Sequence, residues 1–569
     1  MREANANLSV KIAKAFVQSD GSNGNGAGIV IIIPNDANVS IRDDDNIEVE
    51  SLFPSDEECI RIAKHVGLSE TSFVALLSSA AIAAVAEKKT AATPPPPTTT
   101  TASDNCLIDC ASKTTVAAAA DFHVKWFTPE TEVNLCGHAT IALAGYIHSI
   151  CNNSKNDEYP RQKFQYWKMQ CKSGLLGIEI FDDDDDDDDG RTSLPRVVME
   201  QANPGFCEVV DYKEIAESLN INANTDLAIA DILIDDGDNG YDKSNRKKMR
   251  PKSRFPFRSC EIVSTGGRDL MIPIRSTVLD EINILGRKNK HDGNSNSSSS
   301  NVKSIQPQLL CDRINIVSKR YDLVGYHMFE VDDDLFMNNH DIDTDDNSGE
   351  IETDSDNNDG ENSSSCYKNK NNNNARSPIH LNELISIFQR AEEDGLGSES
   401  CLKAVIVDDD DDEDDEDDDQ QQQDDNGDIN DSKAGNFSNN NSRDISHVVT
   451  HNDDIPVDTM IRSRVIRVTG VRSFAPYVGV PEEPATGSAN GALSCYLVKH
   501  LFLDAYCCSN HQHTISRNII NFRFSIEQGR SMKEPCLIDT EIHVFNGNIV
   551  TVKVGGLVKV TGDSIEMEV

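Results

Sequence analysis

The sequence contains no apolar run that approaches the roughly 20 residues needed to cross a bilayer as a helix. Residues 1–8 also lack the charged-then-apolar order of a secretory signal peptide. We therefore expect a cytoplasmic protein with no membrane association. Its 15 cysteines are then expected to be reduced thiols rather than a disulfide framework.

Basic residues are scarce, with 53 Lys and Arg against 96 Asp and Glu, and the net charge is −43 at pH 7. No basic stripe with interleaved aromatic residues occurs, so nucleic-acid binding is not expected. Two acidic runs, Asp182–Asp189 and Asp408–Asp419, contribute 8 and 12 negative charges. Because both runs lie between apolar segments rather than within them, we interpret them as solubilising loops.

Familiar cofactor and catalytic motifs are also missing. There is no P-loop, no dinucleotide-binding fingerprint and no Gly-x-Ser-x-Gly elbow. Cys106 and Cys110 fall in a low-complexity segment, and the Cys507-Cys508 pair has no second cluster of ligands. The sequence therefore predicts neither a metal site nor a cofactor.

Polar tracts interrupt the chain, and they hold too few apolar groups to offset the entropy of ordering. They lie at about 87–120, 182–189, 288–306, 332–374 and 408–454. Read as disordered insertions, they leave enough sequence for about two domains. We expect an N-terminal half at 1–190, a C-terminal half at 193–550, and a C-terminal strand at 551–569 that returns to the first half.

The remaining segments predict an α+β protein in which strands outnumber helices. Strands are expected at 11–17, 28–33, 123–127, 176–180, 196–199, 269–274, 465–468, 521–526 and 550–554. Helices are expected at 56–66, 139–150, 212–218, 381–392 and 490–501. The helices at 139–150 and 490–501 are small and apolar on every face, which is typical of an enclosed helix. We therefore predict two barrel-like halves, each a strongly curved, mostly antiparallel sheet around a central helix.

Two short glycine-containing segments precede these apolar helices: Cys136–Ala139 and Ala485–Ala489. A helix start that opens on glycine exposes unpaired N–H groups and the positive end of the helix dipole to a carboxylate. Each segment also follows acidic residues, Glu132 in the first and Glu482-Glu483 in the second. Two facing helix starts with carboxylates beside them suggest an enzyme that moves a proton on a small anionic molecule.

Several motifs together resemble the phenazine biosynthesis PhzF-like family, in the family's order and over nearly the whole chain. The strongest are Leu68-Ser69-Glu70-Thr71-Ser72-Phe73-Val74, Phe127-Thr128-Pro129-x-x-Glu132-Val133-x-Leu135-Cys136-Gly137-His138-Ala139, Ser473-Phe474-Ala475-Pro476-x-x-Gly479-Val480-x-Glu482-Glu483-Pro484-Ala485-Thr486-Gly487-Ser488-Ala489 and Glu527-Gln528-Gly529. Weaker matches are Gly24-Asn25-x-Ala27-Gly28, Ser264-Thr265-Gly266-Gly267-Arg268-Asp269-Leu270 and Val554-Gly555-Gly556.

The resemblance implies the diaminopimelate epimerase-like fold, a cofactor-independent isomerase and a homodimer. It also implies that a glutamate, here Glu70, shuttles a proton on a cyclic hydroxy acid. His138, Glu483 and Ser488 match the family's other polar site positions. One departure is that the family usually has Asp where this sequence has Glu483, and the extra methylene could shift the carboxylate by about an ångström.

We expect the Glu70 carboxylate to enter an apolar cleft, where desolvation would raise its pKa toward the working pH. On its spacing alone, a surface glutamate that caps a turn is the alternative. His138 at a helix start is expected to be a neutral imidazole, because the dipole disfavours its charged form. The alternative is a core histidine.

The substrate carboxylate is expected to bind at the two helix starts. Ser488 and the N–H groups of Gly487 and Ala489 would hold it from the second half. The residues Gly137, Ala139 and Asn25 complete the predicted binding set. A plain N-cap is the alternative for Ser488, and an ordinary solvated side chain is the alternative for Glu483, which otherwise orients His138 or a substrate amino or hydroxyl group.

Cys136 distinguishes two mechanisms, because epimerases of this fold use one cysteine from each half. The second half has Ala485 where we expect the partner thiol. A thiol-dependent epimerase acting through Cys136 is thus the alternative enzyme, and Cys136 is otherwise a small packing residue. A non-catalytic protein that binds basic partners through its acidic loops is the alternative from outside enzymology.

Overall fold

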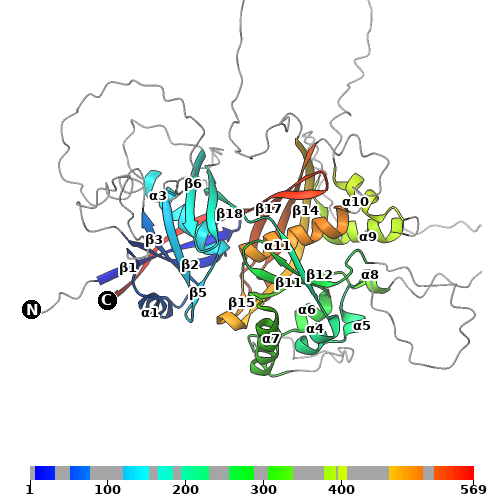
Figure 1. Ribbon diagram of the computed structural model, residues 1–569, viewed down its shortest axis with the longest axis horizontal. Coiled ribbons are helices and arrows are strands. Elements are labelled where there is room, and N and C mark those ends of the chain that lie inside the picture. Colours follow the sequence, from blue (N-terminus) through cyan, green and yellow to red (C-terminus); the bar gives the residue numbers. More distant parts are fainter. Residues whose placement is uncertain are drawn as a thin grey trace, which may run out of the picture.

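The computed structural model describes residues 7–32, 52–76, 120–152, 164–182, 194–229, 255–286, 305–337, 377–392, 395–406, 460–503 and 518–568. The described strands form one continuous hydrogen-bonded system that is wrapped into two halves lying side by side (Figure 1). Within these ranges no helix is both long enough and apolar enough to cross a membrane.

The first half is a ring of strands that closes on itself. Its elements are β1 (Asn7–Val17), β2 (Asn25–Ile32), α1 (Asp56–Val66), β3 (Thr71–Leu76), β4 (Phe122–Phe127), β5 (Glu132–Val133), α3 (Gly137–Asn152), β6 (Phe164–Cys171), β7 (Gly174–Phe181) and β8 (Arg196–Gln201). The pairing runs β1–β2–β3–β4–β6–β7–β8, and the last strand of the chain, β18 (Asn548–Glu568), joins β8 back to β1. Only the β2–β3 and β4–β6 pairs in this ring are parallel.

The second half repeats this order with additional helices. Its elements are β9 (Gly205–Val210), α4 (Tyr212–Leu219), α5 (Ala223–Asp226), β10 (Cys260–Ser264), β11 (Arg268–Arg275), α6 (Ser276–Glu281), α7 (Pro307–Tyr321), β12 (Gly325–Val331), α8 (Asp334–Met337), β13 (Ile379–His380), α9 (Leu381–Glu392), α10 (Gly397–Val405), β14 (Met460–Ala475), β15 (Val480–Glu483), α11 (Gly487–Val498), β16 (Ile519–Gln528) and β17 (Cys536–Phe545). Short 3₁₀ turns lie at Pro476–Val478 and Arg530–Met532, and a π-helical turn at Lys499–Leu503 extends α11. The sheet runs β9–β10–β11–β12–β14–β16–β17–β18, so β18 belongs to both halves.

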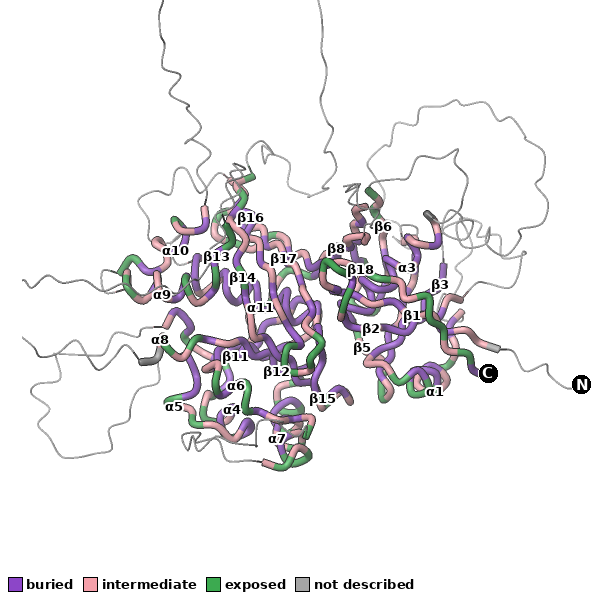
Figure 2. The backbone as a smooth tube through the Cα atoms, turned by 180° about the vertical axis from the view of Figure 1, so that it is seen from behind, coloured by how far each residue is buried: buried purple, intermediate pink, exposed green. Residues whose placement is uncertain are grey.

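Each half encloses one apolar helix. Every residue of α11 is buried, as the colouring of its backbone shows (Figure 2). The helix α3 packs its apolar side chains against β1, β2, β8 and β18. Burial on all sides explains why these two helices have no polar face in the sequence. The predicted α+β architecture of two curved, mostly antiparallel sheets around central helices is confirmed.

The hydrogen-bond registers define equivalent positions in the two halves. Thr71 of β3 pairs with the phenylalanine of Phe127-Thr128-Pro129, and Tyr326 of β12 pairs with that of Phe474-Ala475-Pro476. Thr71 and Tyr326 are therefore equivalent, and so are the residues before them, Glu70 and Gly325. The two halves share a backbone plan that the sequence motifs follow.

The structure also adds elements that the sequence analysis did not predict. The helix α7 was missed although it buries Leu310, Ile314 and Val317 at helical spacing, and β14 and β18 are much longer than the strands predicted there. The proline in the first turn of α7 and the residue Asp322, which ends the helix in a left-handed conformation, were signals for this helix.

Most of the predicted disordered tracts, including the acidic run at 408–419, lie outside the described residues. At their margins, α8 falls within the tract predicted at 332–374, and Asp182 pairs with buried His148 at 2.8 Å. The cysteines at 106, 110, 507 and 508 are also outside the described residues. The domain boundaries at 190, 193 and 550 stay a prediction.

Candidate active site

The two enclosed helices begin against each other. A Cβ atom placed on Gly137 would lie 2.8 Å from Cα of Gly487 and 2.9 Å from the amide nitrogen of Ser488. Only glycine lets two backbones approach this closely, which explains the glycine at both helix starts. Both positive helix ends therefore point at one place, where a carboxylate would be stabilised.

A cavity of about 420 Å³ opens at these helix starts, between the two halves. Gly137 and His138 line it from the first half, and Gly487, Ser488 and Glu483 line it from the second. Ser488 is buried, and its carbonyl accepts a hydrogen bond of 3.2 Å from the hydroxyl of Thr265. A cavity of this volume lies in the range of small-molecule sites.

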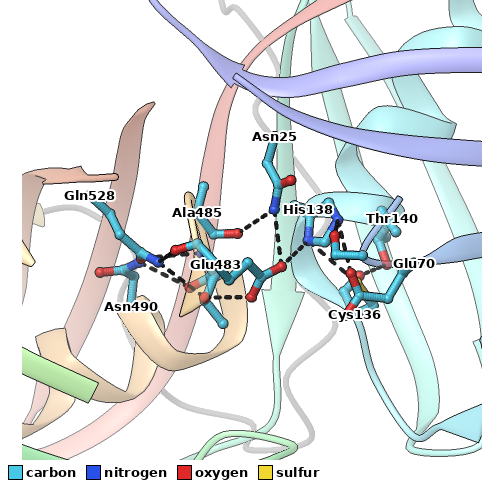
Figure 3. A network of polar contacts seen from close by, with 12 residues as sticks. Asn25, Glu70, Cys136, His138, Thr140, Glu483, Ala485, Asn490 and Gln528 are labelled. Atoms are coloured by element: carbon cyan, nitrogen blue, oxygen red, sulfur yellow. Dashed lines mark hydrogen bonds and ion pairs between the residues drawn. The ribbon is translucent and has the colours of Figure 1, made fainter. Parts of the chain in front are cut away.

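Glu70 lines this cavity from the residue just before β3. It is only 7% exposed, and its Oε2 lies 3.3 Å from Nε2 of His138 without a hydrogen-bond alignment (Figure 3). Burial, followed by the nearby charge of Glu483, raises the pKa of Glu70 to about 7, although His138 and Ser69 act to lower it. A carboxyl group with this pKa can both take and return a proton near neutrality.

His138 lies between two carboxylates. Its Nδ1 is 2.8 Å from Oε1 of Glu483, and its Nε2 faces Glu70 and the hydroxyl of Ser69, each at 3.3 Å. Burial lowers the pKa of His138, but Cys136, Glu483 and Glu70 outweigh it, so that the pKa lies well above its usual value. The expectation of a neutral imidazole is wrong, because the helix dipole is weaker than two carboxylates in contact.

Glu483 is fixed by contacts from both halves. Its Oε1 accepts a 3.0 Å hydrogen bond from Nδ2 of Asn25, and its Oε2 accepts a 2.6 Å hydrogen bond from the hydroxyl of Thr486. The same Asn25 amide also donates to the carbonyl of Ala485 at 2.9 Å. Glu483 thus reaches His138 even though the family usually has the shorter Asp.

A buried amide network supports Glu483 from behind. Nε2 of Gln528 donates to the backbone carbonyl of Glu483 at 2.8 Å, and its Oε1 accepts from Nδ2 of Asn490 at 2.7 Å. Oδ1 of Asn490 lies 3.2 Å from Nε2 of His327. The sequence analysis missed this network, although Gln528 stood in the quoted Glu527-Gln528-Gly529 motif.

Three predicted substrate-binding residues do not line the cavity. Ala139 and Ala489 are fully buried in the helices, one residue beyond His138 and Ser488, and Asn25 contacts Glu483 instead. Ala139 and Ala489 could therefore contribute to substrate binding only through their backbone groups. Asn25 could contribute only through its contact with Glu483.

Cys136 lines the cavity with its Sγ 3.5 Å from Nδ1 of His138. Burial, followed by the charge of Glu70, raises the pKa of Cys136 to about 12, so it is a neutral thiol near pH 7. Its equivalent at the second helix start is Thr486, one residue before Gly487, and not Ala485 as the sequence analysis had it. The conclusion that the second half has no partner thiol is unchanged.

Glu70, Cys136 and His138 bring their ligand atoms within 4.8 Å of one another, a spacing that a metal ion could use. His138 also contacts Glu70 on one side and Glu483 on the other. We interpret these residues as a relay of charged groups rather than as a metal site.

Asp269 is a further cavity residue that the sequence analysis did not select. It lies at the start of β11 and is buried, and its Oδ2 has no hydrogen-bond partner within the described ranges. Burial, followed by the charge of Glu483, raises its pKa to about 7. The sequence could have pointed to Asp269, because this residue is part of the weaker motif match at 264–270.

The phenazine biosynthesis-like protein family, PhzC-PhzF, matches residues 103–236 and 435–565. These segments include both helix starts and Glu483, but not Glu70 or Asp269.

Two curated proteins are similar over shorter segments. An uncharacterized isomerase of Clostridium acetobutylicum is 35% identical over 85 residues, which is 15% of this chain and 24% of that protein. An uncharacterized isomerase of Bacillus subtilis is 32% identical over 104 residues, which is 18% of this chain and 30% of that protein. The chain thus spans less than a third of the length of the curated relatives it matches.

Solved structures align over nearly the whole chain at low similarity. A Bacillus anthracis phenazine biosynthesis protein of the PhzF family has 14% identity and a TM-score of 0.43, with 99% of this chain and 100% of that chain covered. A hydroxyproline epimerase of Agrobacterium vitis with bound trans-4-hydroxy-L-proline has 6% identity and a TM-score of 0.37, with coverages of 100% and 93%. The family match in both halves and the motifs quoted above support a resemblance of this chain to the PhzF-like family.

Proposed function

We propose that the protein is a cofactor-independent isomerase that moves a proton on a small carboxylate, with Glu70 as the acid and base. One observation carries the proposal: a buried carboxyl group, with a pKa raised to about 7, lines the cavity at which two helix starts meet. The curated relatives that carry the name isomerase support the same reaction class.

In this proposal the substrate carboxylate binds at the helix starts, at Gly137 and at Gly487-Ser488. The Glu70 carboxylate removes a proton from one carbon of the substrate and becomes a carboxylic acid. It then returns that proton to another carbon of the same molecule as the double bond moves. No atom or electron is gained or lost, so no redox partner is required.

His138 and Glu483 act through Glu70 and the substrate. The positive charge of His138 stabilises Glu70 in its carboxylate form, and Glu483 holds the imidazole in place at 2.8 Å. The expected cytoplasmic location and homodimer remain predictions.

The alternative of a thiol-dependent epimerase is disfavoured by two observations. The pKa of Cys136 is raised to about 12, which leaves almost no thiolate near pH 7, and Thr486 stands at the equivalent helix start. The acidic loops on which a non-catalytic role would depend lie outside the described residues.

Proton transfer can be tested before the natural substrate is known. The protein is incubated with candidate small carboxylic acids in D₂O, and deuterium at carbon is measured by mass spectrometry. We expect incorporation that falls about 10²–10⁴-fold in Glu70→Gln. Glu132→Gln is the matched control, because Glu132 lines the same cavity but pairs with exposed Lys172. Equal incorporation in Glu70→Gln and wild type would refute the proposal.

A further inference from the structure

The buried amides behind Glu483 have defined hydrogen-bond directions, because each of them donates to a backbone carbonyl, which can only accept. Nδ2 of Asn490 donates to the carbonyl of Thr486 at 2.9 Å, so the oxygen of this amide is the atom that faces His327. The same Nδ2 donates to Oε1 of Gln528 at 2.7 Å. Nε2 of Gln528 donates to the carbonyl of Glu483 at 2.8 Å and to the hydroxyl of Thr486 at 3.1 Å. That hydroxyl therefore donates its own hydrogen to Oε2 of Glu483, at 2.6 Å.

The same directions fix the ring proton of His327. Its Nε2 lies 3.2 Å from Oδ1 of Asn490, an atom that can only accept, so Nε2 carries the hydrogen. Its Nδ1 has no hydrogen-bond partner among the described residues, and the side chain is fully buried. Burial lowers the pKa of His327 to about 4, although Asn490 and Glu483 act to raise it. At pH 7 His327 is therefore a neutral imidazole with its hydrogen at Nε2, and it is the first donor of a chain that ends on Glu483.

The first half shows how little a helix start of this kind requires. Thr140 is the equivalent of Asn490, since each lies three residues after the glycine that begins its helix. Oγ1 of Thr140 donates to the carbonyl four residues before it at 2.6 Å, as Nδ2 of Asn490 does at 2.9 Å. Thr140 has no further polar atom in its side chain, whereas Asn490 also contacts Gln528 and His327. These additional contacts are thus not needed to begin an enclosed helix.

The additional contacts occur in the half that carries the carboxylate. In the first half, the residue before the phenylalanine of the Phe-x-Pro motif pairs with Val133 and with Ser72. In the second half, the residue at the same place pairs with Glu483 and with His327. A valine is therefore accompanied by a serine, and the carboxylate of Glu483 is accompanied by the imidazole. The hydrogen-bond chain from His327 follows the carboxylate rather than the helix start.

We propose that His327 is a positioning residue that acts on His138 through Glu483. Its Nε2–H group orients the two buried amides, and these hold the hydroxyl of Thr486 so that it donates to the carboxylate. A carboxylate fixed in this way keeps its 2.8 Å contact with Nδ1 of His138. With the hydrogen at Nδ1 of His327 instead, lone pairs of Nε2 and of the Asn490 oxygen would face each other, and the chain would lose its first donor. This inference rests on the proposed function, in which Glu483 holds the imidazole of His138 in place.

The ring proton of His327 can be observed directly in the full-length protein labelled with ¹⁵N-histidine. The signals of His327 are those that disappear from the NMR spectrum of His327→Gln, and the signals of His138 are assigned in the same way from His138→Gln. At pH 7 we expect one proton on His327, at Nε2, and a hydrogen-bonded proton at Nδ1 of His138. A proton at Nδ1 of His327, or protons on both of its nitrogens, would overturn the proposal.

Two variants with side chains of similar length isolate the donor. His327→Gln keeps an N–H group that can reach Asn490, whereas His327→Met leaves the buried oxygen of Asn490 without its donor. We expect the Nδ1 proton of His138 to exchange with solvent at least about tenfold faster in His327→Met, and within about threefold of the wild type in His327→Gln. Deuterium incorporation should fall by the same factors. Equal exchange in the two variants, or a lower Tm with unchanged exchange, would assign His327 a merely structural role and overturn the proposal.

A second variant tests the last link of the chain without changing the core around His327. Thr486→Val removes the hydroxyl that donates to Oε2 of Glu483 at 2.6 Å and keeps a side chain of similar volume. We expect the Nδ1 proton of His138 to exchange at least about tenfold faster than in the wild type. Unchanged exchange in Thr486→Val would overturn the proposal even if His327→Met fails to fold.

This inference and the proposed function can fail separately, because the exchange measurement needs no substrate. If His327→Gln and His327→Met differ in exchange as expected but no acid gives deuterium incorporation, the isomerase proposal fails and the positioning role of His327 remains. If the wild type incorporates deuterium but the His138 proton exchanges alike in both variants, the positioning role fails and the isomerase proposal remains.

Discussion

The two halves of the molecule share a backbone plan but not a set of side chains. Both present a glycine at the start of an enclosed helix, within the sequences Cys136-Gly137-His138 and Thr486-Gly487-Ser488. The first half supplies Glu70 and His138, and the second supplies Glu483 with its supporting amides. The two helix starts are therefore alike in their backbone, whereas the side chains that would carry the proposed proton transfer differ between the halves.

Among the variants that compare the two halves, the largest effect is expected from removing the close approach that both halves share. In Gly137→Ala the new methyl group would meet the backbone of Gly487 and Ser488 at 2.8 and 2.9 Å, so the helix starts must separate. We expect a loss of more than about 100-fold in activity, since displacements near 1 Å at a site have that effect. Denaturant unfolding should show a destabilisation of about 1–3 kcal/mol.

Two variants serve as comparisons for Gly137→Ala. Gly487→Ala should be milder, because its methyl group would meet the ring of Phe16 at 3.1 Å and Gly137 at 3.2 Å. Gly26→Ala is the control, with its nearest contact at an ordinary 3.6 Å from Leu68. Full activity in Gly137→Ala would mean that the two helix starts do not form one site.

Replacing Glu483 with the family's usual Asp tests whether the second half has adapted to the longer side chain. Glu483→Asp withdraws the carboxylate from His138, Asn25 and Thr486, which contact it at 2.6 to 3.0 Å. We expect kcat/KM to fall by about 10- to 100-fold. Activity equal to or above that of the wild type would show instead that the backbone shifts enough for the shorter Asp side chain to keep its contact with His138.

The buried carboxyl groups of the two halves should have matching effects on stability against pH. The pKa of Glu70 and the pKa of Asp269 are each raised to about 7, so the folded state keeps both protons to a higher pH than the unfolded chain does. Their contribution to stability is complete below about pH 4 and is lost as pH rises through 7.

We therefore expect Glu70→Gln and Asp269→Asn each to gain stability relative to the wild type between pH 4.5 and pH 8, by a few kcal/mol at most. Thermal unfolding at both pH values measures this difference. A gain confined to one variant would show that the carboxyl groups are not equivalent in burial and charge.

The smallest effect is expected at the residues that precede the two helix glycines. Cys136→Ala should change activity by no more than about threefold, because the neutral thiol makes one 3.5 Å contact with His138. Thr486→Ala should cost more, about tenfold, because it removes the 2.6 Å hydrogen bond to Glu483. If Cys136→Ala abolishes turnover, the thiol is an acid or base after all.

Much of the fold and part of the site could be predicted from the chain because local patterns encode them. Strand segments alternate in apolar residues, and the two helices without a polar face could only be enclosed. Glu70, His138 and Glu483 were selected from motifs, and the structure brings all three within 3.3 Å contacts. The long strands β14 and β18 were underestimated, because polar residues on their exposed stretches look like loop sequence.

Other features depend on residues that are remote in the sequence. The charge of His138 could not be predicted, because Glu483 reaches it from 345 positions away along the chain. Asp269 and Gln528 lie in quoted motifs, yet only the side-chain contacts of the folded chain show their places. Asp269 Oδ2 has no hydrogen-bond partner among the described residues, and Gln528 donates to the backbone of Glu483.

Local sequence encodes the two enclosed helices, their glycine starts and the composition of the strands, since each depends on residues within a few positions of one another. The tertiary structure alone decided which carboxyl groups are buried together, which of them are paired, and that β18 joins both halves. The physical reason is that pKa values and hydrogen-bond partners are set by distances through space and by exclusion of water, neither of which follows from local sequence.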